Sequence, residues 1–257
     1  MLKYLRYILV IIPHLLWCYF AWMIKYARHP QRYPLEKRYN RIRKLVLFTF
    51  RHFRIQIISE NEKYFTEAKT PFVLYANHYS DLDPLLLVAL SKRPITFVAK
   101  KETLKFPFIG KVVKILEGVT IDRANLRSQI IAIDAAVKMI EDGHNVVIFP
   151  EGTRTRNPDL MIGEFKPGAF KLSYRTGANI IPCALYGTFR PLSTKTNLKI
   201  NPIWIKFFDP IEKNDFLQIN TVNMAPMVQG MIQQEITNNM KVRDADFVTN
   251  LKNKKSK

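Results

Sequence analysis

From residue 55 onward, short apolar runs alternate with stretches in which apolar residues recur at helical spacing. Several of these runs are continuous, which is typical of strands that are buried on both faces of a sheet. The runs that predict strands are 55–58, 72–76, 95–99, 118–121, 146–149 and 180–187. Strands that alternate with helices predict an α/β fold, with a mostly parallel sheet flanked by helices.

The longest helical stretch in this region is 128–143. Ser128 stands where an N-cap belongs, and Gly143 stands where a glycine commonly ends a helix. The residues expected to form its apolar face are Ile130, Ile133, Val137 and Ile140. Further helices are expected over 83–91, 166–177 and 227–236, the last followed by a basic tail.

The start of the chain has a different pattern, because Tyr7–Ile24 is apolar and carries no formal charge when His14 is neutral. As a helix, this segment would extend over roughly 27 Å, just short of a hydrocarbon core of roughly 30 Å. Pro13 and His14 near its middle favour a kinked or re-entrant helix over a straight spanning one. The segment therefore predicts a membrane anchor that spans or dips. The alternatives are a buried core helix and a cleaved signal peptide, although no small-residue cleavage site follows.

A basic window follows the apolar segment. Between Lys25 and Arg54 there are ten lysines and arginines and one acid, Glu36, which gives +9 of the chain's net charge of +19. The helix expected over 41–54 has apolar and basic positions on different faces, which is typical of a helix lying on an anionic membrane. Its apolar positions are Ile42, Leu45, Val46, Thr49 and Phe53.

These two segments suggest a division of the chain. We expect 1–54 to form membrane-anchoring or interfacial helices, and 55–257 to form the α/β domain with a C-terminal amphipathic helix and a basic tail. Because positive charge is retained on the inner side of membranes, the basic flank and the domain after it are expected at the cytoplasmic face.

Composition narrows the possible partners. With 257 residues, 47% of them apolar, the chain can form a real core. A net charge of +19 favours partners that carry phosphate: nucleic acid, anionic lipid or a small substrate. About half of the net charge lies in the window beside the apolar segment, and no aromatic–basic RNA motif occurs, so we expect no nucleic acid. Cys18 and Cys183 lie far apart, and the five histidines are dispersed, so no disulfide framework or metal site is indicated.

The segment Asn77-His78-Tyr79-Ser80-Asp81-Leu82-Asp83 places several polar residues between apolar runs. His78 and Asp83 are five apart, so they can meet only if a turn intervenes, and Asp83-Pro84 could provide one. By itself the pattern favours a helix start, with Asp83 as N-cap or with Ser80 and Asp83 in a capping box. A serine hydrolase is disfavoured because no G-x-S-x-G elbow occurs in the chain. Capping and proton transfer remain compatible interpretations.

Two more segments place charged residues after predicted strands. The run 146–149 leads into Pro150, Glu151, Gly152, Thr153 and Arg154, and the run 118–121 leads into Asp122 and Arg123. In open parallel sheets, ligands bind at the carboxyl ends of the strands. Two arginines at such ends favour a phosphate cradle, although an ordinary turn with a salt-bridged arginine would have the same local pattern.

Together these segments resemble the bacterial 1-acylglycerol-3-phosphate (lysophosphatidate) acyltransferases of phospholipid synthesis. Residues 77–83 match an N-H-x-x-x-x-D block, residues 149–154 match F-P-E-G-T-R, residues 118–123 match an intervening block that ends in arginine, and 180–185 is similar to a fourth block. The resemblance covers roughly residues 70 to 212, and four blocks in the same order are far more specific than any one of them.

The resemblance implies roles for individual residues. His78 would be the general base and Asp83 would orient it. Arg123 and Lys100 would help hold a phosphate, while Tyr79 and Asp81 occupy variable positions that could tune the choice of substrate. The residues implied in shaping the acceptor site are Glu151, Gly152, Thr153 and Arg154.

The implied reaction transfers a fatty acyl group from acyl-CoA or acyl-carrier protein to the sn-2 hydroxyl of 1-acylglycerol 3-phosphate, giving phosphatidic acid. The expected partners are the membrane lipid acceptor, the thioester donor and an anionic membrane surface. No cofactor or metal is expected, because a thioester is a good leaving group. We further expect direct transfer, with backbone N–H groups near Gly152 stabilising the oxyanion. The alternatives are another acceptor, such as glycerol 3-phosphate or a different lysophospholipid, and a non-enzymatic basic protein that binds membranes.

Overall fold

The computed structural model describes residues 7–156, 159, 161–193 and 198–253. The basic tail at 254–257 lies outside the described residues. The chain forms two compact units, each made of two stretches of sequence. The first unit consists of Met1–His52 and Leu85–Val146, and the second consists of Phe53–Pro84 and Val147–Lys257. The expected division at residues 54 and 55 stays a prediction.

The second unit contains four neighbouring strands. They follow the order β1 (Ile55–Glu60), β7 (Asn201–Phe207), β6 (Asn179–Tyr186) and β2 (Phe72–Ala76). The pairs β1–β7 and β2–β6 are parallel, and β6–β7 is antiparallel. β2 is buried along its whole length, as its uninterrupted apolar sequence predicts.

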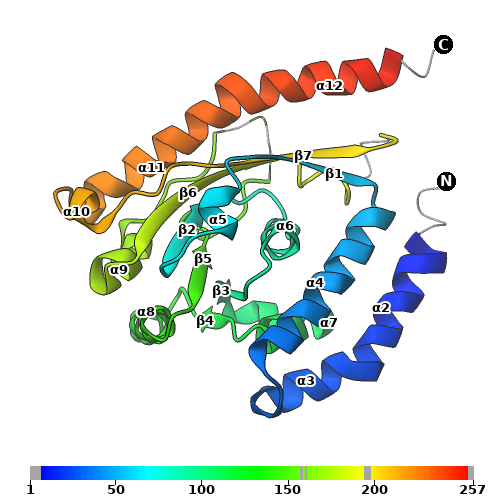
Figure 1. Ribbon diagram of the computed structural model, residues 1–257, viewed down its shortest axis with the longest axis horizontal. Helices are drawn as coiled ribbons and strands as arrows, with labels where there is room; N and C mark the ends of the chain where they lie inside the picture. Colours follow the sequence, from blue (N-terminus) through cyan, green and yellow to red (C-terminus); the bar gives the residue numbers. More distant parts are fainter. Residues whose placement is uncertain (1–6, 157–158, 160, 194–197, 254–257) are drawn as a thin grey trace. The chain divides into compact units, whose positions relative to one another are not determined.

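Helices cover these strands in the second unit. They are α5 (Lys63–Thr66), α9 (Pro167–Thr176), α10 (Lys213–Phe216), α11 (Thr221–Glu235), a π-helical stretch (Ile236–Met240) and α12 (Lys241–Asn253). The Phe170 ring of α9 stacks on the Tyr75 ring of β2, with centroids 4.2 Å apart. α11 packs against α9 and β6, and Figure 1 shows α11 and α12 as one long orange-to-red rod. As expected, α9 ends at Gly177, whose φ of 74° is the left-handed value that favours glycine.

The first unit contains the N-terminal helices, a pair of strands and the helices that follow them. β3 (Ile95–Lys100) and β4 (Val119–Ile121) are parallel. α6 (Asp83–Leu90) and β5 (Asn145–Ile148) each cross a boundary between the two units. The remaining helices of this unit include α4 (Leu35–His52), a 3-10 turn (Lys101–Lys105), α7 (Pro107–Ile115) and α8 (Leu126–Glu141). The expected mostly parallel sheet with flanking helices is confirmed.

The apolar N-terminal segment is a helix that runs past Pro13. It consists of π-helical Tyr7–Ile11, α2 (Ile12–Cys18), π-helical Tyr19–Met23 and α3 (Ile24–Arg28). Among the described residues, Ile8–Arg28 is the one stretch long and apolar enough to cross a membrane by length and composition. Figure 1 shows this dark-blue helix folding back beside α4, and it also packs against α7.

The two faces of this helix differ. Cys18, Trp22, Met23 and Tyr26 are buried inside the first unit. The opposite face exposes large apolar side chains, namely Ile8, Leu9, Val10, Ile12, Leu16, Trp17 and Phe20. An exposed apolar patch of this kind marks a surface for a partner or a lipid bilayer. The helix therefore suggests a membrane anchor.

The expectation for α4 was wrong in one respect. Ile42, Leu45, Val46 and Phe53 are buried, so the apolar face that was expected to lie on a membrane instead packs inside the protein. Amphipathicity gives the same pattern for a helix lying on lipid and for one packed on a protein core. The membrane-facing candidate is therefore the N-terminal helix, beside which α4 presents exposed basic side chains such as Lys37, Arg41 and Lys44.

The other helices show smaller differences from expectation. The N-cap of α8 is Asn125, whose side chain accepts a hydrogen bond from the Ser128 N–H, so Ser128 is not the cap. Ile130 is exposed, whereas Val137 and Ile140 are buried, so the expected apolar face of α8 holds only toward its end. Gly143 has φ 88° at the helix end, as predicted.

Candidate active site

The site begins where β2 ends. Asn77, directly after the strand, is fully buried and pairs with the backbone of Leu185 in β6. Its Nδ2 donates to the Leu185 carbonyl at 2.9 Å, and its Oδ1 accepts from the Leu185 N–H at 2.8 Å. The amide thus extends the strand pairing by one step. The next residue, His78, is therefore held at the carboxyl end of a buried parallel strand.

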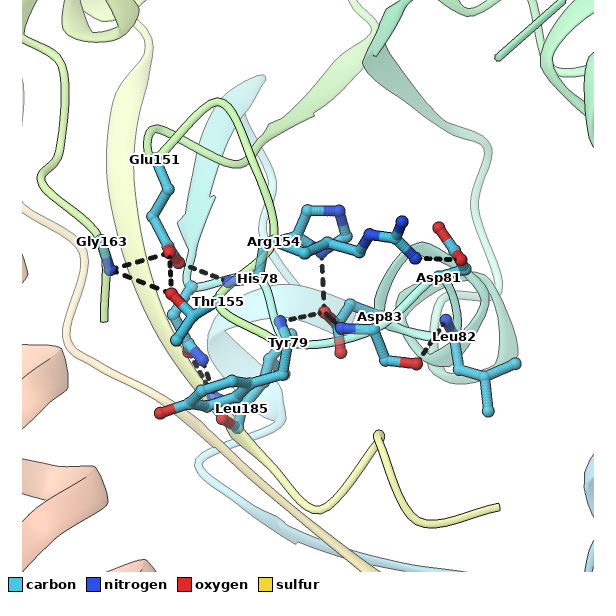
Figure 2. A network of polar contacts seen from close by, with 12 residues as sticks. His78, Tyr79, Asp81, Leu82, Asp83, Glu151, Arg154, Thr155, Gly163 and Leu185 are labelled. Atoms are coloured by element: carbon cyan, nitrogen blue, oxygen red, sulfur yellow. Dashed lines mark hydrogen bonds and ion pairs between the residues drawn. The ribbon is translucent and has the colours of Figure 1, made fainter. Parts of the chain in front are cut away.

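His78 and Asp83 meet, as the turn between them was expected to allow. His78 Nδ1 lies 2.8 Å from Asp83 Oδ2 (Figure 2). Because a carboxylate can only accept, this contact places a proton on Nδ1, and in the neutral tautomer the lone pair is then on Nε2. The ring stacks on Phe149, with centroids 4.2 Å apart, and the side chain is 17% exposed. The imidazole is thus held through one nitrogen and one ring face, and the neutral tautomer leaves the other nitrogen able to accept a proton.

Asp83 also fixes the loop that carries His78. Its Oδ2 accepts from the backbone N–H groups of Tyr79 and Ser80, at 2.7 and 2.8 Å. The bond from Ser80 is one half of the expected capping box, but Ser80 Oγ accepts from Leu82 N–H rather than from Asp83. Oδ1 is buried and has no hydrogen-bond partner among the described residues. The carboxylate therefore faces back toward the loop and the imidazole, and it is not an N-cap for the helix that follows.

Glu151 ties the second sequence block to the first. It is buried, and both of its oxygens are used within the protein (Figure 2). Oε1 accepts from His78 N–H at 2.6 Å, while Oε2 accepts from Thr155 Oγ1 at 2.7 Å and from Gly163 N–H at 2.8 Å. In addition, Thr155 N–H donates to the His78 carbonyl at 2.8 Å. The carboxylate thus holds three separate segments together around the backbone of His78.

Burial raises the pKa of the Glu151 carboxyl above its ordinary value. The hydrogen bonds from Thr155, His78 and Gly163 and the charge of His78 oppose this shift, because they favour the ionised form. Only the ionised carboxylate offers acceptors to all three donors without rearrangement. The site therefore depends on keeping a buried carboxylate charged.

The next residues of this block lie in a turn. Gly152 has φ 71°, a left-handed value that glycine adopts without strain. Its N–H donates to the Phe149 carbonyl at 3.0 Å, so this amide is occupied by the turn and cannot serve as the oxyanion donor. The expected oxyanion donors among the backbone N–H groups near Gly152 stay a prediction. Thr153 is exposed, and Arg154 forms an ion pair with Asp81 through Nη1 and Oδ2.

Lys100 and Arg123 belong to the first unit. Lys100 ends β3 and lies 3.6 Å from Glu102, and both side chains are about half exposed. Arg123 follows β4 and is exposed as a residue. Partial desolvation nevertheless lowers the pKa of its guanidinium, and Glu102 opposes that shift. Both residues occupy strand ends, as expected from the sequence, and their roles stay predictions.

The remaining candidate nucleophiles and bases are buried. Ser80 is 6% exposed, and its hydroxyl accepts from Leu82 N–H. Cys183 is fully buried, and burial together with the charge of Asp83 raises the pKa of its thiol. The Tyr79 phenol is buried against Tyr186 and Phe189, and burial raises its pKa as well. These groups stay protonated, so His78 is the accessible base of this cluster.

Some residues of the site were not singled out from sequence. Phe149 supports the imidazole ring, and Thr155 and Gly163 complete the contacts of Glu151. Only Asn77 had a usable signal, as a polar residue directly after a fully apolar strand. Among the residues that the structure describes, no group of three or more His, Cys, Asp or Glu side chains could hold a metal ion.

The chain is similar to known proteins of one family. A family model described as Acyltransferase matches residues 56–186, slightly more than half of the chain. The chain is 32% identical over 247 residues to a probable 1-acyl-sn-glycerol-3-phosphate acyltransferase from Mycoplasma genitalium, covering 89% of each chain. The chain belongs to the 1-acyl-sn-glycerol-3-phosphate acyltransferase family.

Two further comparisons cover less of the chain or have lower identity. A 1-acyl-sn-glycerol-3-phosphate acyltransferase from Borreliella burgdorferi is 33% identical over 120 residues, which cover 47% of each protein. The crystal structure of the 1-acyl-sn-glycerophosphate (LPA) acyltransferase PlsC from Thermotoga maritima is 20% identical, with a TM-score of 0.70, covering 92% of this chain and 97% of that one. At this identity the structural likeness shows the fold alone. The residues matched by the Acyltransferase family model include both the His78 block and the Glu151 block.

Proposed function

We propose that this protein transfers a fatty acyl group from a thioester, either acyl-CoA or acyl-carrier protein, to the sn-2 hydroxyl of 1-acylglycerol 3-phosphate. The product is phosphatidic acid, an intermediate for phospholipid synthesis. The observation that carries the proposal is the His78–Asp83 pair, which presents an accessible imidazole nitrogen in a chain similar to curated enzymes of this activity. The donor is a substrate, and no resident cofactor or metal is invoked.

His78 supplies the base in this mechanism. The acceptor hydroxyl attacks the thioester carbonyl while its proton passes to His78 Nε2, which contributes about 10²–10⁴-fold to the rate. Asp83 holds the reactive tautomer and stabilises the imidazolium as it forms. When the tetrahedral intermediate collapses, the carbon–sulfur bond breaks and the imidazolium returns the proton to the departing thiolate. Acyl transfer is then complete, and His78 is neutral again.

Transfer is direct in this proposal, without an acyl-enzyme. A covalent route needs an activated nucleophile within hydrogen-bond reach of the base. Ser80 is buried and faces the Leu82 amide, and the Cys183 thiol is buried with a raised pKa. Neither residue meets that requirement.

Recognition of the acceptor phosphate is assigned to cations. Arg154 follows the Glu151 block on the same side of the strands as His78, because Thr155 bonds to the His78 carbonyl. From the family resemblance, Arg123 and Lys100 are proposed to bind phosphate as well, and Gly152 and Thr153 are proposed to shape the acceptor site. Guanidinium groups suit the task because they bind phosphate oxygens in pairs.

Glu151 is proposed to position His78 rather than to contact the acceptor, because its oxygens already accept hydrogen bonds from the protein.

The proposed location is the cytoplasmic face of the cell membrane. The exposed apolar face of the N-terminal helix would enter the lipid, and the basic residues after it would face anionic headgroups. This placement gives the enzyme access to an acceptor that resides in the bilayer.

The experiment that tests this function uses purified protein with a panel of acceptors. The panel contains 1-acylglycerol 3-phosphate, glycerol 3-phosphate and other lysophospholipids, each offered with acyl-CoA and with acyl-carrier protein. We expect phosphatidic acid, identified by mass, as the main product. Preferential acylation of glycerol 3-phosphate or of another lysophospholipid would replace the proposed acceptor, while absence of any acylated product would refute the activity.

A further inference from the structure

Arg154, the cation proposed to bind the acceptor phosphate, forms an ion pair with Asp81 (Figure 2). Both side chains are reachable from solvent, at 54% exposure for Asp81 and 36% for Arg154. Asp81 lies only three residues after His78, in the same loop. Arg154 is therefore already paired with an anionic group of the protein itself, close to the reacting residue.

Fixed backbone holds both partners in place. On one side, Asp83 Oδ2 ties down the amides of Tyr79 and Ser80, and Ser80 Oγ accepts from Leu82 N–H. On the other side, Thr155 N–H bonds to the His78 carbonyl. Because the two loops cannot separate easily, Asp81 and Arg154 stay within reach of each other. Their side chains are the parts that can rearrange.

We propose that Asp81 is a specificity-determining residue: its carboxylate pairs with Arg154 until the acceptor phosphate displaces it. The inference rests on the proposed role of Arg154 in binding that phosphate. A carboxylate has two oxygens and one negative charge, whereas a phosphate monoester has three free oxygens and up to two charges, so the phosphate is the stronger guanidinium ligand. A headgroup without a phosphate cannot displace Asp81 and leaves Arg154 in its ion pair.

The size of the effect follows from the exposure of the pair. Exposed ion pairs contribute little to stability. In the wild type the acceptor must break this pair to bind, and that cost should weaken acceptor binding by no more than about fivefold. Asp81 also repels an approaching phosphate directly. Removing its charge should therefore strengthen binding of phosphate-bearing acceptors and leave acceptors without phosphate unchanged.

The kinetic test compares Asp81→Asn, Arg154→Gln and the double variant with the wild type, using 1-acylglycerol 3-phosphate and monoacylglycerol as acceptors. We expect Asp81→Asn to lower KM for the phosphate acceptor about two- to fivefold, with a smaller change in kcat, and to leave monoacylglycerol kinetics unchanged. In the Arg154→Gln background this lowering of KM should be smaller.

The matched control is Glu164→Gln, which removes an equal charge from an exposed ion pair with Lys166. A higher KM in Asp81→Asn would show that Asp81 only positions Arg154, and this would overturn the inference.

A binding measurement separates this inference from the proposed function. Calorimetric titration of the detergent-purified protein with glycerol 3-phosphate, without a donor, should give an affinity about two- to fivefold higher in Asp81→Asn than in the wild type. If this gain appears but no acceptor is acylated, the proposed function fails and the inference stands. If acylation proceeds normally and Asp81→Asn changes neither KM nor this affinity, the function stands and the inference fails.

Discussion

At the scale of single residues, one carboxylate oxygen organises the proton-transfer pair. Asp83 Oδ2 accepts from the imidazole and from two amides of the same loop. The tautomer of His78 and the shape of the loop are therefore set by the same atom. Any change at Asp83 is expected to disturb both of them together.

The first prediction concerns His78. His78→Ala should lower kcat by about 10²–10⁴-fold because it removes the base, while the protein stays folded and bound to membranes. Turnover is measured with the accepted acceptor, and folding is measured by circular dichroism. His144→Ala, at a histidine in the turn before β5, provides the control and should keep wild-type activity. Turnover of His78→Ala at the control rate would remove the residue from the mechanism.

The second prediction concerns Gly163, whose N–H contacts Glu151. A Cβ at this position would lie 2.8 Å from Glu151 Oε2, so Gly163→Ala must push the carboxylate away from its donors. Because Glu151 holds the backbone of His78, kcat should fall by up to about 100-fold. Gly168→Ala is the matched control, since a Cβ there meets nothing within 4 Å. Equal activity of the two variants would contradict a positioning role for Glu151.

The third prediction follows from the raised pKa of Glu151. An acid whose pKa is higher in the folded state binds more protons folded than unfolded, so its contribution to stability declines as pH rises through the interval between the two values. Gln cannot titrate. The free energy of unfolding of wild type minus that of Glu151→Gln should therefore decrease as pH rises from about 4 toward neutrality. Denaturant unfolding at a series of pH values measures this difference, and a constant difference would exclude the shift.

At the scale of secondary-structure elements, the sequence pattern predicted the continuous apolar strands and missed a strand whose apolar pattern is interrupted. β2 has the predicted bounds, because an apolar run of five residues between Pro71 and Asn77 is too short for a typical helix and suits a strand buried on both faces. β7 was missed, since Asn201, Pro202 and Lys206 interrupt its apolar pattern. Pro202 is tolerated because the pairing of β7 with β6 covers only Trp204–Phe207, so the missing N–H lies outside that ladder.

The site shows the same limit of sequence information. The contact between His78 and Asp83 is local and follows from a turn over five residues. The contacts of Glu151 with His78 and of Arg154 with Asp81 each join residues 73 positions apart, and they exist only because the fold brings two loops together. No local pattern distinguishes an arginine that is free for phosphate from one that is paired with a carboxylate.

The fourth prediction tests the N-terminal helix as an anchor. Trp17 and Phe20 are 63% and 70% exposed, so replacing both with Ser should leave packing intact and weaken binding to vesicles by at least about tenfold. Sedimentation with liposomes measures the bound fraction. Leu217→Ser, at an exposed leucine of the second unit, serves as the control. These point changes are more informative than deleting 1–54, which would also remove buried Tyr39, Ile42 and Phe50 from the first unit. Equal binding of the double variant and the control would place the anchor elsewhere.

At the scale of the whole molecule, charge and apolar surface make separable contributions to membrane binding. The chain carries +19, with +9 in the window that follows the apolar helix. Attraction to anionic lipid is screened by salt, whereas insertion of apolar side chains is not. The two terms can therefore be measured apart.

The fifth prediction uses this difference. Raising NaCl from about 0.1 M to about 1 M should weaken binding to vesicles that contain anionic lipid and change binding to neutral vesicles much less. The bound fraction at each salt concentration is measured by sedimentation. The same salt dependence on both kinds of vesicle would mean that the net charge does not act through the lipid headgroups.

The arrangement of the N-terminal helix in the first unit has a consequence for biosynthesis. Its buried face packs partly against α7, where Lys111 Nζ lies 5.7 Å from the centre of the Tyr19 ring, yet α7 begins at Pro107. At about 5–20 residues per second, a ribosome needs about 4–16 s to add the residues between Arg28 and Pro107. α4 is made earlier and can cover part of the inner face first, as the contact of Phe48 with His14 shows. The part of the inner face that packs on α7 stays uncovered by α7 during this interval, while the outer face is free to meet a bilayer.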